Sequence, residues 1–519
     1  MWMMGTRGCP RTKRQSDGGL IAQLRCWLGN IGRATRGLLV ALLITSAFAG
    51  MVIAAPSNEA GDAYGLGDYV TAYRLARPLA DAGQPLAQYL LGLMYANGQG
   101  VPQDFAEAAK WYRKAAEQGI AGAQNNLGQL YDEGRGVDMD VAQAVAWFHK
   151  AAALGNATAQ FNLSRMYRTG RGVARDDSQA VAWLLKAAEQ GYPHAQTNLG
   201  LMYATGQGVP TDYAAAVKWF RKAADQGEAL GQNYLGLTYF NGLGVPQDDA
   251  EAIKWYRLGA QQGEANAQTN LGFMYHSGRG VPKDYAAAAN LYRKAAEQGF
   301  AMAQYNLGLN YAKGEGVPLD DTQAVTWLRK ASEQGHAAAQ SSLGYMYKEG
   351  RGVAHNDVQA LAWFRKAAEQ GDAVGQFGVG YMYSKGRGVA KDYAQAVAWY
   401  RKAAEQGLAR AQNNLGGCYS RGEGVTQNSA LAVHWKAKAV QQGDEDAARE
   451  IESDLNKVTA LHATGTVALR ARPEEAAPAL LTLKSGAILY RLDRVGDWYE
   501  VYVHDGHTLG FVAVSAVTE

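Results

Sequence analysis

Tryptophan returns at intervals of 36 residues along most of the chain, and this spacing constrains the fold more than any other feature. The series has one gap, at Leu291, and comprises Trp111, Trp147, Trp183, Trp219, Trp255, Trp327, Trp363, Trp399 and Trp435. Independent loops would lose such a spacing through insertions and deletions. A spacing held over ten units is typical of one structural unit copied head to tail. The sequence therefore predicts a repeat array.

Glycines and acids keep the same register. One glycine series runs from Gly83 to Gly443 and suits helix ends that need a positive φ. A second series, the Gly-x-Gly-Val sequences that begin at Gly98, suits a left-handed turn at the end of the other helix. Four residues after the second glycine comes an acid or amide, Asp104 in the first unit. We expect it to cap the next helix, which contributes about 1 kcal/mol.

Apolar residues between these turns follow a helical period. In the first helix of the unit Ala87, Leu91 and Tyr95 share one face, and in the second helix Ala108 and Trp111 do so. Neither pair of helices can bury its apolar face alone, so neighbouring units must stack. The predicted fold class is mostly α, a right-handed α-α solenoid of about ten 36-residue repeats. We expect the solenoid over residues 63–447, with a half repeat at 63–83 and ten repeats over 84–443.

The repeated sequence A-x-A-Q-x-x-L-G-x-M-Y-x-x-G-x-G-V-x-x-D-x-x-x-A-V-x-W-x-x-K-A-A-E-Q-G is nearly complete in residues 195–227. It resembles the Sel-1-like repeat family, a branch of the tetratricopeptide superfamily. The resemblance implies a non-enzymatic scaffold or adaptor that holds other proteins or peptides together, in processes such as secretion, envelope assembly, polar localisation and protein quality control.

The amino-terminal residues have the composition of a targeting segment. Residues 1–36 carry seven basic residues and one acid, so the formal net charge of +3 divides into +6 for this segment and −3 for the rest. The remainder therefore offers no basic surface for nucleic acid. An uncharged run at 37–55 follows. Residues 1–55 read as a basic leader with either a cleaved signal peptide or an uncleaved inner-membrane anchor. Both versions predict export, to the periplasm or to an inner-membrane position that faces it.

Cysteine usage excludes an intrachain disulfide in the exported part, because Cys418 is alone there. Some secreted relatives of the resembled family are cysteine-rich and are linked to β-lactam binding or hydrolysis. This chain lacks their cysteines. A hydrolase acting on β-lactam or cell wall remains an alternative function, and a secreted effector that binds host proteins is another.

The pattern changes after Gly443. A capping helix and a linker are expected at 448–464, and apolar alternation with glycine turns predicts short strands at 465–519. Within that stretch the segments 467–473, 483–486, 496–501 and 510–512 resemble a bacterial Src-homology-3-like (SH3b) domain. The resemblance implies a small all-β barrel that binds peptidoglycan or a peptide and carries no catalytic residue.

Function in such an array is expected where the copies differ. By analogy with tetratricopeptide arrays, the first helix of each unit lines the concave groove. Asparagine recurs at one outward position, where amides suit either the backbone of an extended peptide or bonds within the array. Aromatic residues occupy other variable positions. The candidate partner-binding residues are Asn126, Asn162, Asn198, Asn270, Asn306, Asn414, Phe161, Phe273, Tyr345 and Tyr381.

The loop-side charges also vary along the array. They change from acids at Asp132 and Glu133 to cations at Lys313, Lys348, Lys385 and Arg421. Such a gradient suits either an oriented partner or ordinary solvated surface.

No catalytic, cofactor or metal site is predicted. The histidines occupy different repeat positions and do not gather on one face as ligands or a general base would. The recurring tryptophan lies on the apolar side of the second helix and is expected in the core. Lys114 and Glu117, in the sequence K-A-A-E, are expected to form an i, i+3 pair on a solvated face.

Overall fold

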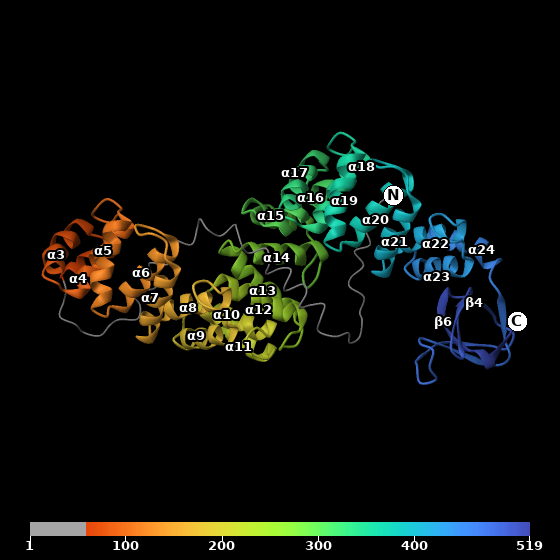
Figure 1. Ribbon diagram of the computed structural model, residues 1–519, viewed down its shortest axis with the longest axis horizontal. Helices are drawn as coiled ribbons and strands as arrows, with labels where there is room; N and C mark the ends of the chain where they lie inside the picture. Colours follow the sequence, from red (N-terminus) through yellow and green to blue (C-terminus); the bar gives the residue numbers. More distant parts are fainter. Residues whose placement is uncertain (1–58) are drawn as a thin grey trace. The chain divides into compact units, whose positions relative to one another are not determined.

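The computed structural model describes residues 59–519, so the predicted leader at 1–55 lies outside the described residues (Figure 1). The described chain forms 23 α-helices followed by a seven-stranded antiparallel sheet. It divides into two compact units, one ending at Lys283 and the other beginning at Asp284. The predicted fold class, an α-helical repeat solenoid with a small all-β domain after it, is confirmed.

The unit that ends at Lys283 contains α2 (Glu59–Gly65), α3 (Tyr69–Asp81), α4 (Pro85–Asn97), α5 (Phe105–Glu117), α6 (Ala121–Glu133), α7 (Val141–Ala153), α8 (Ala157–Thr169), α9 (Asp177–Glu189), α10 (Pro193–Thr205), α11 (Tyr213–Asp225), α12 (Ala229–Asn241), α13 (Asp249–Gln261) and α14 (Ala265–Ser277).

The unit that begins at Asp284 contains α15 (Tyr285–Glu297), α16 (Ala301–Lys313), α17 (Asp321–Glu333), α18 (Ala337–Glu349), α19 (Asp357–Glu369), α20 (Ala373–Lys385), α21 (Tyr393–Glu405), α22 (Ala409–Arg421), α23 (Ser429–Val440) and α24 (Glu445–Leu455). Its strands are β1 (Ala460–Ala463), β2 (Val467–Arg470), β3 (Ala479–Leu483), β4 (Ile488–Val495), β5 (Trp498–Val503), β6 (Thr508–Ala513) and β7 (Val517–Thr518), with a short 3-10 helix, η1 (Val514–Ala516), before β7.

Helix ends follow the predicted turn chemistry. Asp104 accepts hydrogen bonds from the backbone amides of Ala106 and Glu107 and so caps α5. The same position caps the second helix of every later repeat. Gly98 and Gly100 both have a positive φ, as predicted for the turn after α4. The repeat boundaries are therefore set by local side-chain and backbone chemistry.

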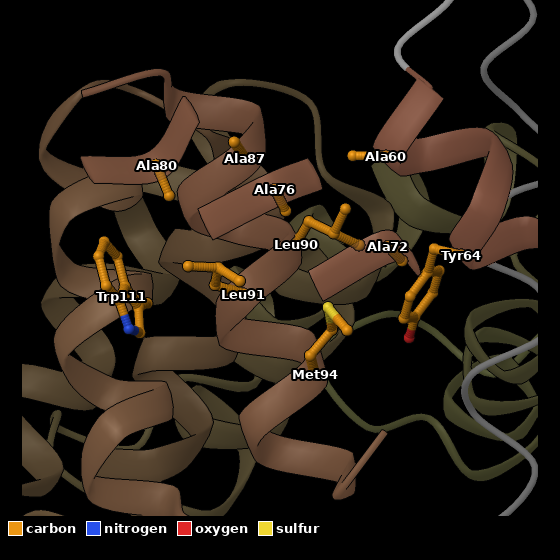
Figure 2. Packing of buried hydrophobic residues seen from close by; sticks show 10 residues of the cluster. All are labelled: Ala60, Tyr64, Ala72, Ala76, Ala80, Ala87, Leu90, Leu91, Met94 and Trp111. Carbon is orange, nitrogen blue, oxygen red and sulfur yellow. The ribbon is translucent and has the colours of Figure 1, made fainter. Parts of the chain in front are cut away.

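Small residues let the two helices of a repeat approach closely. A Cβ atom added at Gly200 of α10 would lie 2.7 Å from the Phe220 ring of α11, so only glycine fits there. Alanines allow a similarly close approach between repeats. Ala72, Ala76 and Ala80 of α3 are fully buried against the leucines of α4 (Figure 2). Figure 2 also shows Trp111 close to Leu91. The core is thus a series of thin layers, one for each helix pair.

Buried glutamines bond one repeat to the next. The side-chain amide of Gln196 donates to the carbonyl of Ala188 at 3.0 Å, and its oxygen accepts from Gln226 at 2.7 Å. Other repeats make the same paired contacts. These contacts satisfy a polar side chain that would otherwise be costly to bury.

The tryptophans lie in the core or at its edge, as predicted. Trp111 is 4% exposed and Trp219 is 8% exposed. The expected pair between Lys114 and Glu117 is wrong, because the Lys114 ammonium instead lies 4.2 Å from the centre of the Trp111 ring. Seven other repeat tryptophans contact the lysine three residues further along the chain in the same way, and Trp255 contacts Lys254 instead. A cation over the ring face is favourable and covers the apolar ring at the surface.

First helices of neighbouring repeats contact one another within each unit. α4 contacts α6, α10 contacts α12, α12 contacts α14, and α18 contacts α20. The second helices approach each other less closely among the described residues. Where these contacts occur, the first helices lie on the inner side of the stack, in agreement with the analogy to tetratricopeptide arrays.

The sheet has the order β3-β2-β6-β5-β4-β1-β7. Its core includes Leu469, Leu489, Val501 and Val512. Strand β1 lies within the expected linker and pairs with β4 and β7, so the sheet begins before residue 465. The other face of β4 and β5 does not face solvent, because Tyr490 and Tyr502 pack against α23 and α24. The other residues of this cluster are Val433, Ala437, Ile451, Leu455, Val458, Leu492 and Leu509.

Among residues 59–519, every helix is too short or too polar to cross a bilayer.

Candidate partner-binding face

The asparagines predicted to face a partner lie on the first helices, and several of their amides are already bonded within the array. Asn162 of α8 donates to the side-chain oxygen of Asn125 of α6 at 3.0 Å. Asn270 of α14 makes the corresponding bond to Asn233 of α12 at 2.9 Å. Asn126 accepts from Asn125 at 3.2 Å. The bonds of Asn162 and Asn270 hold neighbouring first helices together, whereas the bond to Asn126 lies within α6.

The remaining asparagines are half-buried on the same face. Asn198 donates to the carbonyl of His194 at 2.8 Å, and its oxygen faces Arg168 at 3.5 Å. Burial raises the pKa of Tyr400 to about 12, and the nearby Asn414 side chain is among the groups that oppose this shift. Asn306 is half-buried on α16. This face therefore does not present a continuous row of free asparagine amides.

One of the aromatic candidates is exposed. Phe273 of α14 is 45% exposed although it is a large apolar residue. Its ring meets the edge of Phe240 of α12 at a centroid distance of 5.9 Å. The guanidinium of Arg279 stacks 3.8 Å from the centre of the Phe240 ring. Arg279 fixes Phe240, and Phe240 supports Phe273, so an exposed aromatic ring is held in a defined position.

Two further aromatic candidates share one cation. The ammonium of Lys348 lies 4.8 Å from the ring centres of both Tyr345 and Tyr381. These residues come from α18 and α20, and both tyrosines are half-buried. Lys348 also pairs with Glu349 at 2.6 Å. The structure thus gathers two predicted aromatic residues and one cation of the predicted gradient into one cluster.

Phe161 belongs to a third aromatic group. Its ring lies 5.5 Å from Tyr192 and 6.4 Å from His194. His194 Nδ1 lies 3.4 Å from the carboxylate of Glu228, which also accepts a hydrogen bond from Thr197. Glu228 caps α12 through the Gly231 amide. Here aromatic and acidic groups stabilise the ends of the first helices.

Arg168 was not predicted from the sequence. It lies near the end of α8, at a repeat position that holds small, acidic or apolar residues in most other units. Burial lowers the pKa of Arg168 below its ordinary value, and the nearby Asp177 and Tyr234 only partly oppose this effect. The only sequence feature that could have identified Arg168 as functional is a large cationic side chain at a position that varies among the repeats. Without the fold, nothing distinguishes it from an exposed arginine.

Within residues 59–519 there is no group of three or more histidine, cysteine, aspartate or glutamate side chains arranged to hold a metal ion. Cys418 is buried, and this burial raises the pKa of its thiol to about 11. A thiol with so high a pKa is almost entirely protonated at neutral pH and is a poor nucleophile.

Comparison with known proteins gives a consistent result. The family described as Sel1 repeat matches ten consecutive segments: residues 85–120, 121–156, 157–192, 193–228, 229–264, 265–300, 301–336, 337–372, 373–408 and 409–444. The comparison with curated proteins found no match.

Two solved structures extend the comparison. One is described as c5321, a protective antigen present in uropathogenic Escherichia coli strains displaying an SLR fold. It is 40% identical, covers 78% of this chain and 87% of its own chain, and superposes with a TM-score of 0.65. A Sel1 repeat protein from Oxalobacter formigenes is 35% identical over 59% of this chain and 89% of its own, with a TM-score of 0.43.

Proposed function

The chain belongs to the Sel1 repeat family, and from that premise we propose that it is a non-enzymatic scaffold that binds a protein partner on the inner face of its first helices. Proteins built from Sel1 repeats are generally protein-interaction scaffolds, and the fold is typically non-catalytic. The inner face is proposed because the first helices carry the variable side chains, whereas the second helices carry the repeated tryptophan, lysine and alanine.

The observation that carries this proposal is the exposed aromatic ring of Phe273 on its support of Phe240 and Arg279. Burial of a large apolar side chain away from water is favourable, so an exposed one gains free energy when a partner covers it. Aromatic residues held rigidly at a surface are common centres of protein interfaces because they bury much area and lose little conformational entropy. The cluster of Tyr345, Lys348 and Tyr381 supplies the same chemistry in the second unit.

A photo-crosslinking amino acid placed at single positions in the full chain tests the proposed face. Phe273 and Tyr345 are the inner-face positions. Lys218 and Ala362, which are exposed on the second helices α11 and α19, are the outer-face controls. We expect one protein to be captured from both inner positions and from neither control. Capture from the controls with none from Phe273 or Tyr345 would overturn the proposal.

The scaffold is further proposed to act in the bacterial envelope, with its repeats in the periplasm. This proposal is supported by the basic leader and the apolar run at 37–55, which suit a signal peptide or an inner-membrane anchor. Protease added to spheroplasts should digest the repeats while a cytoplasmic marker stays intact. Protection of the repeats until the membrane is lysed would contradict it.

The carboxy-terminal sheet is proposed to be SH3-like and to dock the scaffold to peptidoglycan or a peptide. The support is the sequence resemblance over 467–512 together with a small antiparallel sheet in that region. Purified protein should sediment with isolated sacculi if the ligand is peptidoglycan. Failure to sediment, with unchanged capture of the protein partner, would reject peptidoglycan and leave the scaffold function intact.

A further inference from the structure

Arginines in the array usually have strong partners. Arg279, Arg351 and Arg387 each reach back to a carboxylate and a backbone carbonyl of the preceding repeat. Arginines on the second helices donate instead to a tyrosine hydroxyl of the following repeat, as Arg329 does to Tyr347 at 3.1 Å. These contacts explain why an arginine is placed at such positions.

Arg168 is an exception to this rule. It is half-buried on α8, and its hydrogen-bond partner is the Asn198 oxygen of α10 at the long distance of 3.5 Å. Among the described residues, no carboxylate lies within ion-pair distance of its guanidinium. A guanidinium that has lost part of its hydration without gaining an anion is unfavourable in the free protein.

The charges around Arg168 do not compensate it. Arg165 and Arg171 share the single carboxylate of Asp132, at 2.9 Å and 3.0 Å, so this carboxylate is already paired with two other arginines. Arg165, Arg168, Arg171 and Asp132 together carry a formal net charge of +2. Neither α8 nor α10 contains an acidic residue. Asp177 of α9 is occupied by Arg175 and Gln207. The inner face at this repeat is therefore a small basic site.

We infer that Arg168, with Arg165 beside it, binds a carboxylate of an acidic segment in the protein partner. The inference rests on the proposed function, because Arg168 lies on the face proposed for that partner. A guanidinium pairs well with a carboxylate through two parallel hydrogen bonds. A nucleic acid is a poorer match, because it needs a long row of uncompensated cations, and here most of the other arginines are already paired.

The inference also predicts an unusual effect on stability. Arg168→Met removes an uncompensated charge and keeps the apolar stem, so the thermal midpoint should stay the same or rise. Arg171→Gln breaks an ion pair with buried Asp132, so the midpoint should fall. If Arg168→Met lowers the midpoint as much as Arg171→Gln does, Arg168 is a packing residue and the inference is wrong.

Binding is measured with the full chain and a fluorescently labelled oligo-glutamate peptide, followed by anisotropy at low salt. Arg168→Gln should weaken binding by roughly tenfold or more, and Arg168→Lys should weaken it less. The control is Arg257→Gln, the same charge change at an exposed arginine of α13 in the same unit. An oligo-glutamine peptide of equal length should not bind.

Two results of the direct binding measurement would overturn the inference. One is an unchanged affinity for oligo-glutamate in Arg168→Gln, and the other is an equal loss in Arg257→Gln, which would indicate unspecific charge attraction. Either result would leave the scaffold proposal standing if crosslinking from Phe273 still captures the partner. Displacement of the peptide by phosphorylated serine peptide but not by further oligo-glutamate would also reject a carboxylate as the ligand.

Discussion

The ammonium of Lys436 lies 2.9 Å from a carboxylate oxygen of Asp454, and both side chains are buried where the repeats end. Lys436 occupies the position that holds Tyr112, Phe148 or Tyr400 in other repeats. The Ser420 hydroxyl donates to the second oxygen of Asp454 at 2.5 Å. The cap helix α24 is thus attached to the last repeat by a buried polar contact in place of an aromatic ring.

Asp454→Ala should release this cap. It would leave the buried Lys436 ammonium with only the exposed carboxylate of Glu450, at 3.4 Å, so the loss should approach the cost of about 3–5 kcal/mol for breaking a buried ion pair. We expect the amide protons of α24 to exchange much faster in this variant than in the wild type. The double variant Lys436→Met/Asp454→Leu, which removes both charges, should restore protection. Equal losses in the single and double variants would show that the contact with α24 does not depend on this pair.

Truncation of a repeat tryptophan should cost more than loss of its lysine. Trp219→Ala removes a ring that is 8% exposed and should destabilise the local repeats by about 3–5 kcal/mol. Lys222 lies 4.4 Å from the centre of that ring, so Lys222→Gln should cost about 0.5–1 kcal/mol. Lys294→Gln is the matched control, because Leu291 replaces tryptophan in its repeat. Hydrogen exchange gives each local stability, and an equal effect of the two lysine changes would exclude the cation–ring contact.

The contact between Asp357 and Arg387 should make one repeat interface sensitive to acid. Burial raises the pKa of Asp357, but Arg387 at 2.8 Å and His355 outweigh this effect, and the net pKa lies below its ordinary value. A carboxyl whose pKa is lowered by folding stabilises the fold above its unfolded pKa, and this contribution is lost as pH falls through the folded pKa.

Arg387→Gln should therefore raise the pKa of Asp357 and reduce the stability of the interface between the repeats at 337–372 and 373–408 by about 1 kcal/mol at neutral pH. The difference between variant and wild type should shrink at low pH. A carboxyl NMR titration measures the pKa directly. Arg410→Gln, at an exposed position on α22, is the control and should leave the Asp357 titration unchanged.

The last repeat is adapted to the sheet that follows it. Most other repeats place an arginine at the position of Ala437, which here is fully buried against the cluster that includes Tyr502. His434 Nδ1 also lies 3.1 Å from a carboxylate oxygen of Glu500 on β5. The sheet therefore packs on α23 and is not joined to the array by the chain connection alone.

Ala437→Arg should detach the sheet, because the larger side chain cannot fit between α23 and β5, and overpacking of this kind costs about 1–3 kcal/mol. We expect rapid proteolysis near residues 456–459 in this variant. Leu185→Arg introduces the same side chain at the equivalent position of α9, where other repeats already carry arginine, and should leave the proteolysis pattern unchanged. Resistance of Ala437→Arg to cleavage would contradict this packing.

Features repeated in every unit were predictable from the sequence. The capping acid at Asp104 and the glycine turn at Gly98 depend on local sequence, and the same pattern occurs in all ten repeats. The repeat register and the helix ends could therefore be assigned without the fold. The buried position of tryptophan followed from helical periodicity.

Features that depend on a single long-range contact were not predictable. The alternation of Tyr490 and Leu492 predicted a strand, but not that this face packs on α23 while Leu489 enters the sheet core. Lys114 was assigned to Glu117 because sequence spacing gives no information on the ring beside it. Arg168 gained its significance only from the absence of an acid on the neighbouring helix, which is a property of the packed array.

The central proposal is that a protein partner binds the inner face of the first helices, and the affinity of the captured partner for surface variants tests it most directly. Calorimetry on the full chain should show that the double variant Phe273→Ala/Tyr345→Ala binds the captured partner roughly tenfold more weakly or worse, as expected for aromatic residues at the centre of an interface. Lys218→Ala on the outer face should leave the affinity unchanged. An unchanged affinity in the inner-face variant, with a loss in Lys218→Ala, would contradict the proposal.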